Sequence, residues 1–259
     1  MIKLNPPQPP AALKEQIDKW SAELAKQTYK CGSFEEISAT ERKKILQHYK
    51  HKAIKALVFA VSHKKCAYCE RKPANGGGNI EVEHFYPKSL YPELSFQLNN
   101  LLPACRKCNG SKSNHDVKKE PILNPYVDNP EDYIGFLFCE LTYKNDKTHA
   151  IVDTTIEVCN LNSKELRYCR AQVFGEFNSL LIDLKNKIRQ YKFTDNKEKI
   201  IRELKNIIED LEYLAAPDKC HSAFIKYHVF DNKYLSILNL YTLALDLSVT
   251  LQGPTYLLE

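Results

Sequence analysis

The sequence lacks any apolar run long enough to cross a lipid bilayer, so transmembrane helices are not expected. Its first residues, Met1 to Pro7, contain no apolar core segment, which argues against a secretory signal peptide. The glycines at 76–78 predict a flexible turn, and no Gly-Lys-Ser/Thr follows them, which excludes a phosphate-binding P-loop there. There is no internal repeat. With 43% hydrophobic and 27% charged residues, an ordinary cytoplasmic globular protein with no membrane partner is expected.

The cysteines are the most unusual part of the composition, because the chain has nine of them. An odd number in a reducing compartment argues against a disulfide framework. Four form two Cys-x-x-Cys pairs, Cys66/Cys69 and Cys105/Cys108. The remaining five stand singly and are interpreted as small buried hydrophobes; they are Cys31, Cys139, Cys159, Cys169 and Cys220.

The net charge of +5 is distributed unevenly. Residues 1–130 carry 21 Lys and Arg against 13 Asp and Glu, whereas residues 131–259 carry 16 against 19. A basic half that holds the cysteine pairs suits a polyanionic partner such as nucleic acid. Basic faces are also common on solvated surfaces, so the asymmetry alone decides nothing.

Helical periodicity dominates both ends of the chain. Prolines 6, 7, 9 and 10 predict a stiff extended arm, followed by a helix carrying Leu13 to Leu24 at helical spacing. A capping box at Ser38 and Glu41 predicts a second helix with one apolar face as far as Val61. On its other side lie Lys44, His48, Lys52 and Lys55, interpreted as a solvated face slightly in preference to a nucleic-acid contact.

The second half of the chain is expected to be mainly helical. Capping boxes at Asn162/Glu165 and Asp195/Glu198 predict two long helices with apolar stripes, and Pro217 follows the second. The segment 222–250 also reads as helical, while 121–160 is expected to add one or two strands.

Between these parts, the paired cysteines predict a structural zinc site. Zinc takes four soft ligands at tetrahedral corners, and each Cys-x-x-Cys turn supplies two of them. The 35 residues between Cys69 and Cys105 then form a small finger, which needs a metal to fold because it buries little core. Two short runs, 80–83 and 101–104, are expected to be its strands.

The residues inside this finger resemble the HNH endonuclease family. The family pattern is an acid followed by His, then Asn, then Cys-Asn-x-x-Lys, and it matches Glu83-His84, Asn100 and the segment Cys108 to Lys112. The spacing agrees as well, with 16 residues from His84 to Asn100 and 9 from there to Asn109. The resemblance covers about 50 of the 259 residues and implies a ββα-metal fold.

The resemblance also implies a role for each of these residues. His84 matches the general base that takes a proton from the attacking water, and its usual pKa of about 6.5 suits that task. Glu83 and Asn109 match the ligands of a catalytic Mg²⁺ or Mn²⁺. Asn100 matches the residue that holds the loop between the strands and so orients the base.

Some assignments depart from the family pattern or have plain alternatives. Many family members have a further histidine ligand where this chain has Ser113, so the third protein ligand is open and nearby His115 is at most an accessory ligand. Three basic residues are candidate phosphate contacts or, nearly as well, solvated charges; they are Arg106, Lys107 and Lys112.

The layout outside the finger is similar to an HNH subgroup, the nuclease subunit of bacterial Septu-type anti-phage systems, including those attached to retrons. The resemblance implies an ABC/SMC-like ATPase partner, since the chain has no nucleotide-binding motif of its own, and for a retron a reverse transcriptase with its DNA. The proline arm and the acidic helical half are candidate docking surfaces. The arm packing on its own domain is the equal alternative.

The expected fold is α+β and mainly helical, with an HNH ββα-metal finger inserted between N-terminal helices and a C-terminal helical region. The corresponding domains are residues 1–62, 63–120 and 121–259. DNA is the favoured substrate, and a structured RNA such as tRNA is the alternative. Two other functions stay open, a free-standing restriction-type HNH enzyme and a non-catalytic zinc-finger module that binds nucleic acid.

Overall fold

The computed structural model describes residues 1–72 and 80–231. The chain divides into two compact units, one of residues 1–134 and 141–162, the other of residues 135–140 and 163 onward. The three-domain division at residues 62 and 120 stays a sequence-based prediction. The glycine turn at 76–78 and the helical prediction beyond residue 231 lie outside the described residues. Across the described ranges, no helix has the length and apolar character that crossing a membrane requires.

The first unit begins with helices that enclose one hydrophobic core. These elements are α1 (Ala11–Cys31), α2 (Ala39–Leu46), the 3-10 turn η1 (Gln47–Lys50) and α3 (Lys52–Ala60). The predicted apolar stripe of α1 is confirmed, because Leu13, Trp20 and Leu24 are buried together with Ile54 of α3 and Val82 of the finger. This core therefore anchors the finger to the N-terminal helices.

The predicted continuous helix from Ser38 to Val61 is interrupted at His51. Ser38 caps α2 as expected by accepting a hydrogen bond from the Glu41 amide at 3.2 Å. His51 leaves helical geometry and caps α3 through its Nδ1, which accepts from the Ala53 amide. The Trp20 ring stacks on the His48 ring, with their centroids 4.9 Å apart, and also contacts the His51 ring. The helical pattern continues through this break, so the sequence did not reveal it.

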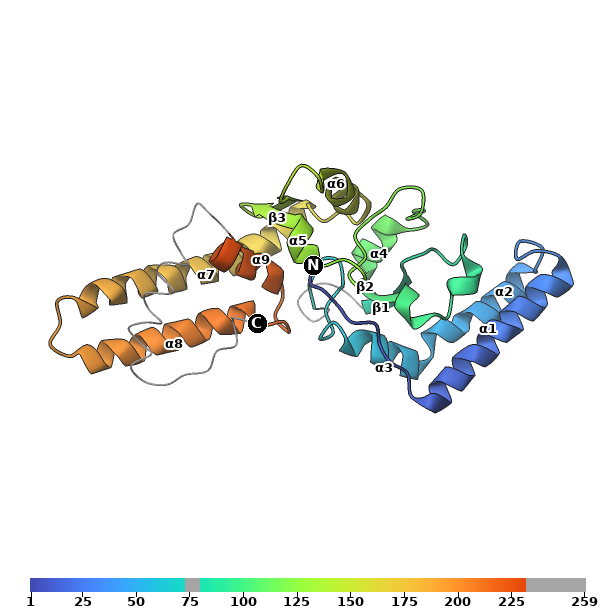
Figure 1. The fold of residues 1–259 in the computed structure, drawn as a ribbon, viewed down its shortest axis with the longest axis horizontal. Helices are drawn as coiled ribbons and strands as arrows, with labels where there is room; N and C mark the ends of the chain where they lie inside the picture. Colours follow the sequence, from blue (N-terminus) through green and yellow to red (C-terminus); the bar gives the residue numbers. More distant parts are fainter. Residues whose placement is uncertain (73–79, 232–259) are drawn as a thin grey trace. The chain divides into compact units, whose positions relative to one another are not determined.

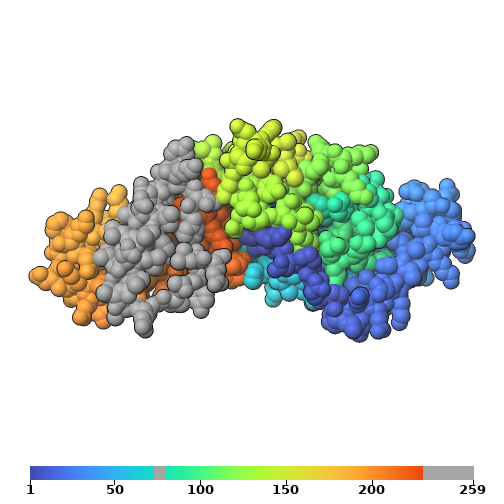
Figure 2. Space-filling view, viewed as in Figure 1, coloured from blue at the N-terminus to red at the C-terminus, as the bar shows by residue number. Residues whose placement is uncertain are grey.

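The proline arm packs on its own unit. The Leu4 amide donates to the Pro125 carbonyl at 2.9 Å, and the Lys3 ammonium donates to the Val127 carbonyl at 2.7 Å. Leu4 is buried, and Figure 2 shows the dark blue arm lying against the yellow-green part of the chain. Of the two expectations for the arm, the structure favours packing over a free docking anchor.

The finger consists of two short strands and a short helix. Strands β1 (Ile80–His84) and β2 (Leu101–Cys105) pair antiparallel, with Glu83 opposite Leu102, and α4 (Arg106–Lys112) follows β2 directly (Figure 1). The connection between the strands contains two 3-10 turns, η3 (Pro92–Leu94) and η4 (Leu98–Asn100). The predicted strands and short helix are thus confirmed.

Residues 121–160 add the two predicted strands and two helices that were not predicted. The elements are α5 (Pro130–Tyr133), β3 (Ile134–Leu137), β4 (Glu140–Tyr143) and α6 (His149–Val158), and the two strands pair as the second sheet. Asn162 bonds both backbone groups of Leu141, at 2.8 and 2.9 Å, so it is not the cap of the next helix. Ser163 caps that helix instead.

The second unit is helical, which confirms the mainly helical α+β fold. It contains α7 (Lys164–Tyr191), α8 (Lys197–Ala215), α9 (Ser222–Lys226) and the π-helical turn η5 (Tyr227–Asp231). The long helices α7 and α8 lie side by side (Figure 1), bury their predicted stripes and share an ion pair of 2.6 Å between Lys187 and Glu203. The cap of α8 is Asn196, one residue after the predicted Asp195.

Candidate active site and metal centre

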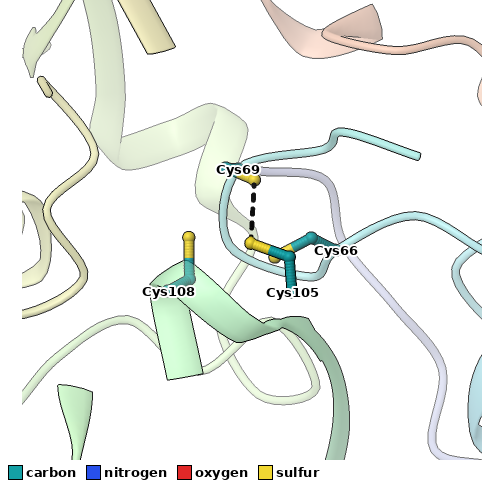
Figure 3. A group of neighbouring side chains, drawn as sticks. All are labelled: Cys66, Cys69, Cys105 and Cys108. Atoms are coloured by element: carbon teal, nitrogen blue, oxygen red, sulfur yellow. Dashed lines mark hydrogen bonds between the residues drawn. The ribbon is translucent and has the colours of Figure 1, made fainter. Parts of the chain in front are cut away.

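The two Cys-x-x-Cys pairs converge on one point of the finger. Cys66 and Cys69 lie on the turn after α3, which is joined to β2 by a 2.7 Å hydrogen bond from the Ala67 amide to the Pro103 carbonyl. Cys105 ends β2 and Cys108 lies in the first turn of α4. All four Sγ atoms lie within 4.8 Å of one another and are buried (Figure 3).

This arrangement has the chemistry of a structural zinc site. The Sγ atoms of Cys69 and Cys105 are 3.8 Å apart, and a tetrahedron with Zn–S bonds of about 2.3 Å has edges of about 3.8 Å. Burial raises the pKa of the Cys66 thiol well above its usual value, so four thiolates here require a cation to offset their charge. The cysteines therefore fit a metal ion.

Strand geometry separates the functional side chains of β1 into two sets. Successive side chains of a strand point to opposite faces, so Glu81 and Glu83 share one face and Val82 and His84 share the other. The first face meets α4, where Asn109 and Lys112 contact it. The second face meets the N-terminal helices.

His84 is held as a neutral imidazole. It is 6% exposed, and its Nε2 lies 3.0 Å from the Ser95 carbonyl. A carbonyl only accepts, so Nε2 carries the proton and Nδ1 keeps its lone pair. Burial, with the positive charge of Lys88, lowers the pKa of His84 to about 3. The ring also contacts Tyr49 of η1 edge to face, with ring centroids 4.6 Å apart.

Each carboxylate oxygen of Glu83 contacts one donor of the protein. Its Oε1 lies 2.6 Å from the Lys112 ammonium and its Oε2 accepts from the Tyr68 hydroxyl at 3.0 Å. Burial and the charge of Glu83 raise the pKa of Tyr68 well above its usual value, so this hydroxyl remains a donor. The Lys112 ammonium also donates to the His84 carbonyl at 3.0 Å. The predicted metal ligand thus already pairs with a buried cation.

Asn109 faces a carboxylate that the sequence reasoning missed. Its Nδ2 lies 2.7 Å from Oε2 of Glu81, and both residues are half-buried. The alternation of β1 was the available signal, because it places Glu81 on the same face as Glu83. An acid and an amide at this distance offer the hard oxygen ligands that Mg²⁺ or Mn²⁺ takes.

Asn100 connects the two ends of the loop between the strands. Its Oδ1 accepts from the Tyr86 amide at 2.7 Å, and its Nδ2 donates to the carbonyls of Tyr86 and Leu94 at 3.2 and 3.1 Å. Leu94 directly precedes Ser95, the partner of His84. Asn100 is therefore placed to hold the loop that fixes the imidazole.

The candidate phosphate contacts and the possible accessory ligand His115 differ in where the structure places them. Lys112 is 1% exposed, so it faces the interior rather than a phosphate. Arg106 and Lys107 are exposed on the first turn of α4. The His115 Nε2 lies 2.7 Å from the Glu120 carbonyl, and the structure does not bring His115 to Glu81 or Asn109.

A groove of about 1000 Å³ opens on the site. Glu81 and Asn109 line it together with Tyr49, the residue that contacts His84. Its other walls come from η1, α3 and the turn that follows α3. Glu81 and Asn109 are thus reached from this open side of the first unit, and His84 lies behind Tyr49, which lines it.

Comparison with known proteins agrees with this geometry. Residues 66–115 match the HNH endonuclease family. The chain is 46% identical over 110 residues to Septu protein PtuB of Bacillus thuringiensis, a match that spans 42% of this chain and 41% of that relative. It is 27% identical over 224 residues to Septu protein PtuB of Bacillus mycoides, across 68% of this chain and 73% of the relative.

A second kind of Septu protein is also similar. Septu protein PtuA of Bacillus mycoides is 29% identical over 145 residues, which is 45% of this chain and 20% of that relative. The similarity therefore extends to Septu proteins of two names, PtuB and PtuA.

Proposed function

We propose that this chain, which carries an HNH endonuclease domain and resembles Septu protein PtuB, is a metal-dependent endonuclease that acts in bacterial anti-phage defence. The observation that carries the proposal is the arrangement around β1. A neutral, oriented His84 lies on one face of the strand, and Glu81 and Asn109 lie on the groove side. A zinc module that only binds nucleic acid needs no such combination.

In the proposed reaction, His84 is the general base. The bond from Nε2 to the Ser95 carbonyl fixes the ring and directs its proton away from Nδ1. Nδ1 then accepts the proton of the water that attacks the phosphodiester. The depressed pKa of His84 keeps the ring neutral at physiological pH, so the base is not lost to protonation. Asn100 acts as a positioning residue through the loop that carries Ser95.

A divalent cation, Mg²⁺ or Mn²⁺, would supply charge stabilisation for the scissile phosphate. Asn109 and Glu83 are the ligands that the family pattern proposes, and Glu81 joins them because it contacts Asn109 and lines the groove. Glu83 would have to bind the cation while also paired with the Lys112 ammonium, whose positive charge opposes that binding. The four cysteines are proposed to hold Zn²⁺ as a separate, structural ion.

We further propose that the nuclease works with an ABC/SMC-like ATPase as its regulatory partner. The similarity to Septu proteins PtuB and PtuA supports this pairing. The acidic, mainly helical half of the sequence, residues 131–259, remains the candidate docking surface, since the arm is occupied on its own unit. A retron reverse transcriptase remains a prediction from the resemblance alone.

Co-expression of the chain with the ATPase encoded beside it, followed by size-exclusion chromatography, tests the partnership. The complex and the isolated chain are then incubated with Mg²⁺ or Mn²⁺ and a panel of duplex DNA, single-stranded DNA and tRNA. We expect co-elution and cleavage that depends on the partner. Elution alone with full activity alone would favour the free-standing restriction-type enzyme, and no cleavage by either sample would contradict the nuclease.

A further inference from the structure

The groove beside the site is lined by both basic and aromatic residues. Three of its lysines are exposed, namely Lys50 at the end of η1, Lys55 of α3 and Lys64 on the following turn. The aromatic residues Tyr49 and Phe59 line it as well and are half-buried. The groove thus combines half-buried rings with several cations.

The charges of these three lysines are not paired within the part of the chain that the structure describes. None of them forms an ion pair with a carboxylate of the described residues. Among the groove residues that the structure describes, Glu81 is the sole acid, and it lies at the site next to Asn109. A groove lined by several lysines, with its acid beside Asn109, suits a polyanion that must reach the proposed metal ligands.

The local backbone holds one of these lysines at the groove. Residues His63 and Lys64 both adopt positive φ angles, of 54° and 60°. The turn is closed by a 2.8 Å hydrogen bond from the Lys64 amide to the Phe59 carbonyl. Two successive left-handed residues that are not glycine are costly, so the turn is held in place by its surroundings.

Tyr49 connects the groove to the catalytic base. Its ring contacts His84, and the ammonium groups of Lys50 and Lys88 lie 5.6 and 5.5 Å from its centre. By contrast, Arg106 of α4 is not among the residues that line the groove. Lys50, Lys55 and Lys64 therefore lie on η1, α3 and the turn after α3, before the segment 66–115 that matches the HNH endonucleases.

We infer that this groove binds a single-stranded stretch of nucleic acid, with Lys50, Lys55 and Lys64 on its phosphates and Tyr49 and Phe59 against its bases. The inference rests on the proposed function and names the form of its substrate. Positive grooves with aromatic side chains are how proteins bind single strands, because unpaired bases expose faces that stack on the rings. Duplex bases are already stacked and cannot use Tyr49 and Phe59.

The test measures binding by the full-length protein without added divalent cation. The probes are a labelled 20-nucleotide single strand and the duplex of the same sequence, titrated by fluorescence anisotropy at several salt concentrations. One variant carries Lys50→Gln, Lys55→Gln and Lys64→Gln. The matched control carries Lys43→Gln, Lys44→Gln and Lys52→Gln, which removes three exposed charges of the same helical region outside the groove.

We expect the wild type to prefer the single strand, and the groove variant to bind it at least tenfold more weakly than the control variant. The plot of log affinity against log salt concentration should become less steep by about 2, since each lost phosphate contact removes about 0.7 from the magnitude of its slope. Tyr49→Leu should weaken binding of the single strand more than binding of the duplex. Because the substituted lysines are exposed, thermal unfolding should remain as in the wild type.

Equal losses in the groove and control variants, preference for the duplex, or no binding of either probe by the wild type would overturn the inference. Cleavage of the same probes by the wild type with Mn²⁺ is scored separately. If the wild type cleaves the probes and the groove variant binds them normally, the role of the groove is contradicted and the nuclease activity is supported. If the groove variant loses binding but the wild type does not cleave the probes, the groove is supported and the nuclease activity is contradicted.

Discussion

Lys112 and Glu83 form a buried ion pair that joins the end of α4 to β1, with 2.6 Å between Nζ and Oε1. The same ammonium donates to the His84 carbonyl, and the other oxygen of Glu83 accepts from Tyr68. The strand that carries His84, the proposed base, is thereby joined to the helix by a charged contact that is buried from water. Three of the residues that define the family pattern are thus coupled mechanically before any substrate binds.

This coupling predicts the stability of charge variants. Lys112→Met should lower the free energy of unfolding by about 3–5 kcal/mol, because it leaves the buried Glu83 carboxylate without its cation. The double variant with Glu83→Gln should recover part of that loss. Urea denaturation of the three proteins measures both effects. A loss below about 1 kcal/mol for Lys112→Met would mean that the pair is not buried as described.

The proposed metal ligands Glu81 and Glu83 should differ in how their substitution affects Mn²⁺ binding and folding stability. Glu81→Gln should weaken Mn²⁺ binding about tenfold or more while leaving thermal unfolding unchanged, since Glu81 is half-buried and its contact partner is the neutral Asn109. Glu83→Gln should weaken Mn²⁺ binding and also lower stability. Isothermal titration calorimetry measures the Mn²⁺ affinity of each variant. An unchanged affinity in Glu81→Gln would show that Glu81 is not a ligand.

The four-cysteine cluster should carry one zinc ion per chain after purification without added metal. Cys105→Ser should lose the ion and unfold the finger, because the binding free energy of such a metal is also folding free energy. Cys31→Ser is the control, since Cys31 lies outside the cluster and is exposed, which corrects its interpretation as a buried residue; of the five single cysteines only Cys159 is buried. Elemental analysis and thermal unfolding report the two effects. A folded finger in a wild-type protein with less than about half an equivalent of zinc would refute the site.

Substitution of the base should affect activity far more than folding. His84→Ala should reduce phosphodiester cleavage at least about 100-fold while zinc content stays at the wild-type level. Loss of the bond to Ser95 and of the contact with Tyr49 should also cost about 1–3 kcal/mol of stability. Ile45→Val, a buried change on α2 that touches none of the proposed site residues' polar groups, controls for that loss because it should reduce stability and keep cleavage. Full activity in His84→Ala would remove the mechanism.

The sequence by itself determined the long helices, the elements of the finger and the four-cysteine cluster. Helical periodicity predicted α1, α7 and α8, and the paired cysteines predicted a common site, because both signals depend on spacings of a few residues. The strands and short helix of the finger followed from the same local patterns. Cap positions were wrong by one residue at α7 and α8, since a neighbouring polar residue competes for the same amide.

Only the tertiary structure decided what each polar residue of the site contacts. Lys112 and Glu83 are 29 positions apart and Glu81 and Asn109 are 28 apart, so their pairing depends on how α4 packs against one face of β1. The break at His51 depends in the same way on a ring from α1. A buried carboxylate takes whichever donor the packing brings to it. For that reason the sequence predicted Lys112 as a phosphate contact or a solvated charge, whereas in the fold it is buried.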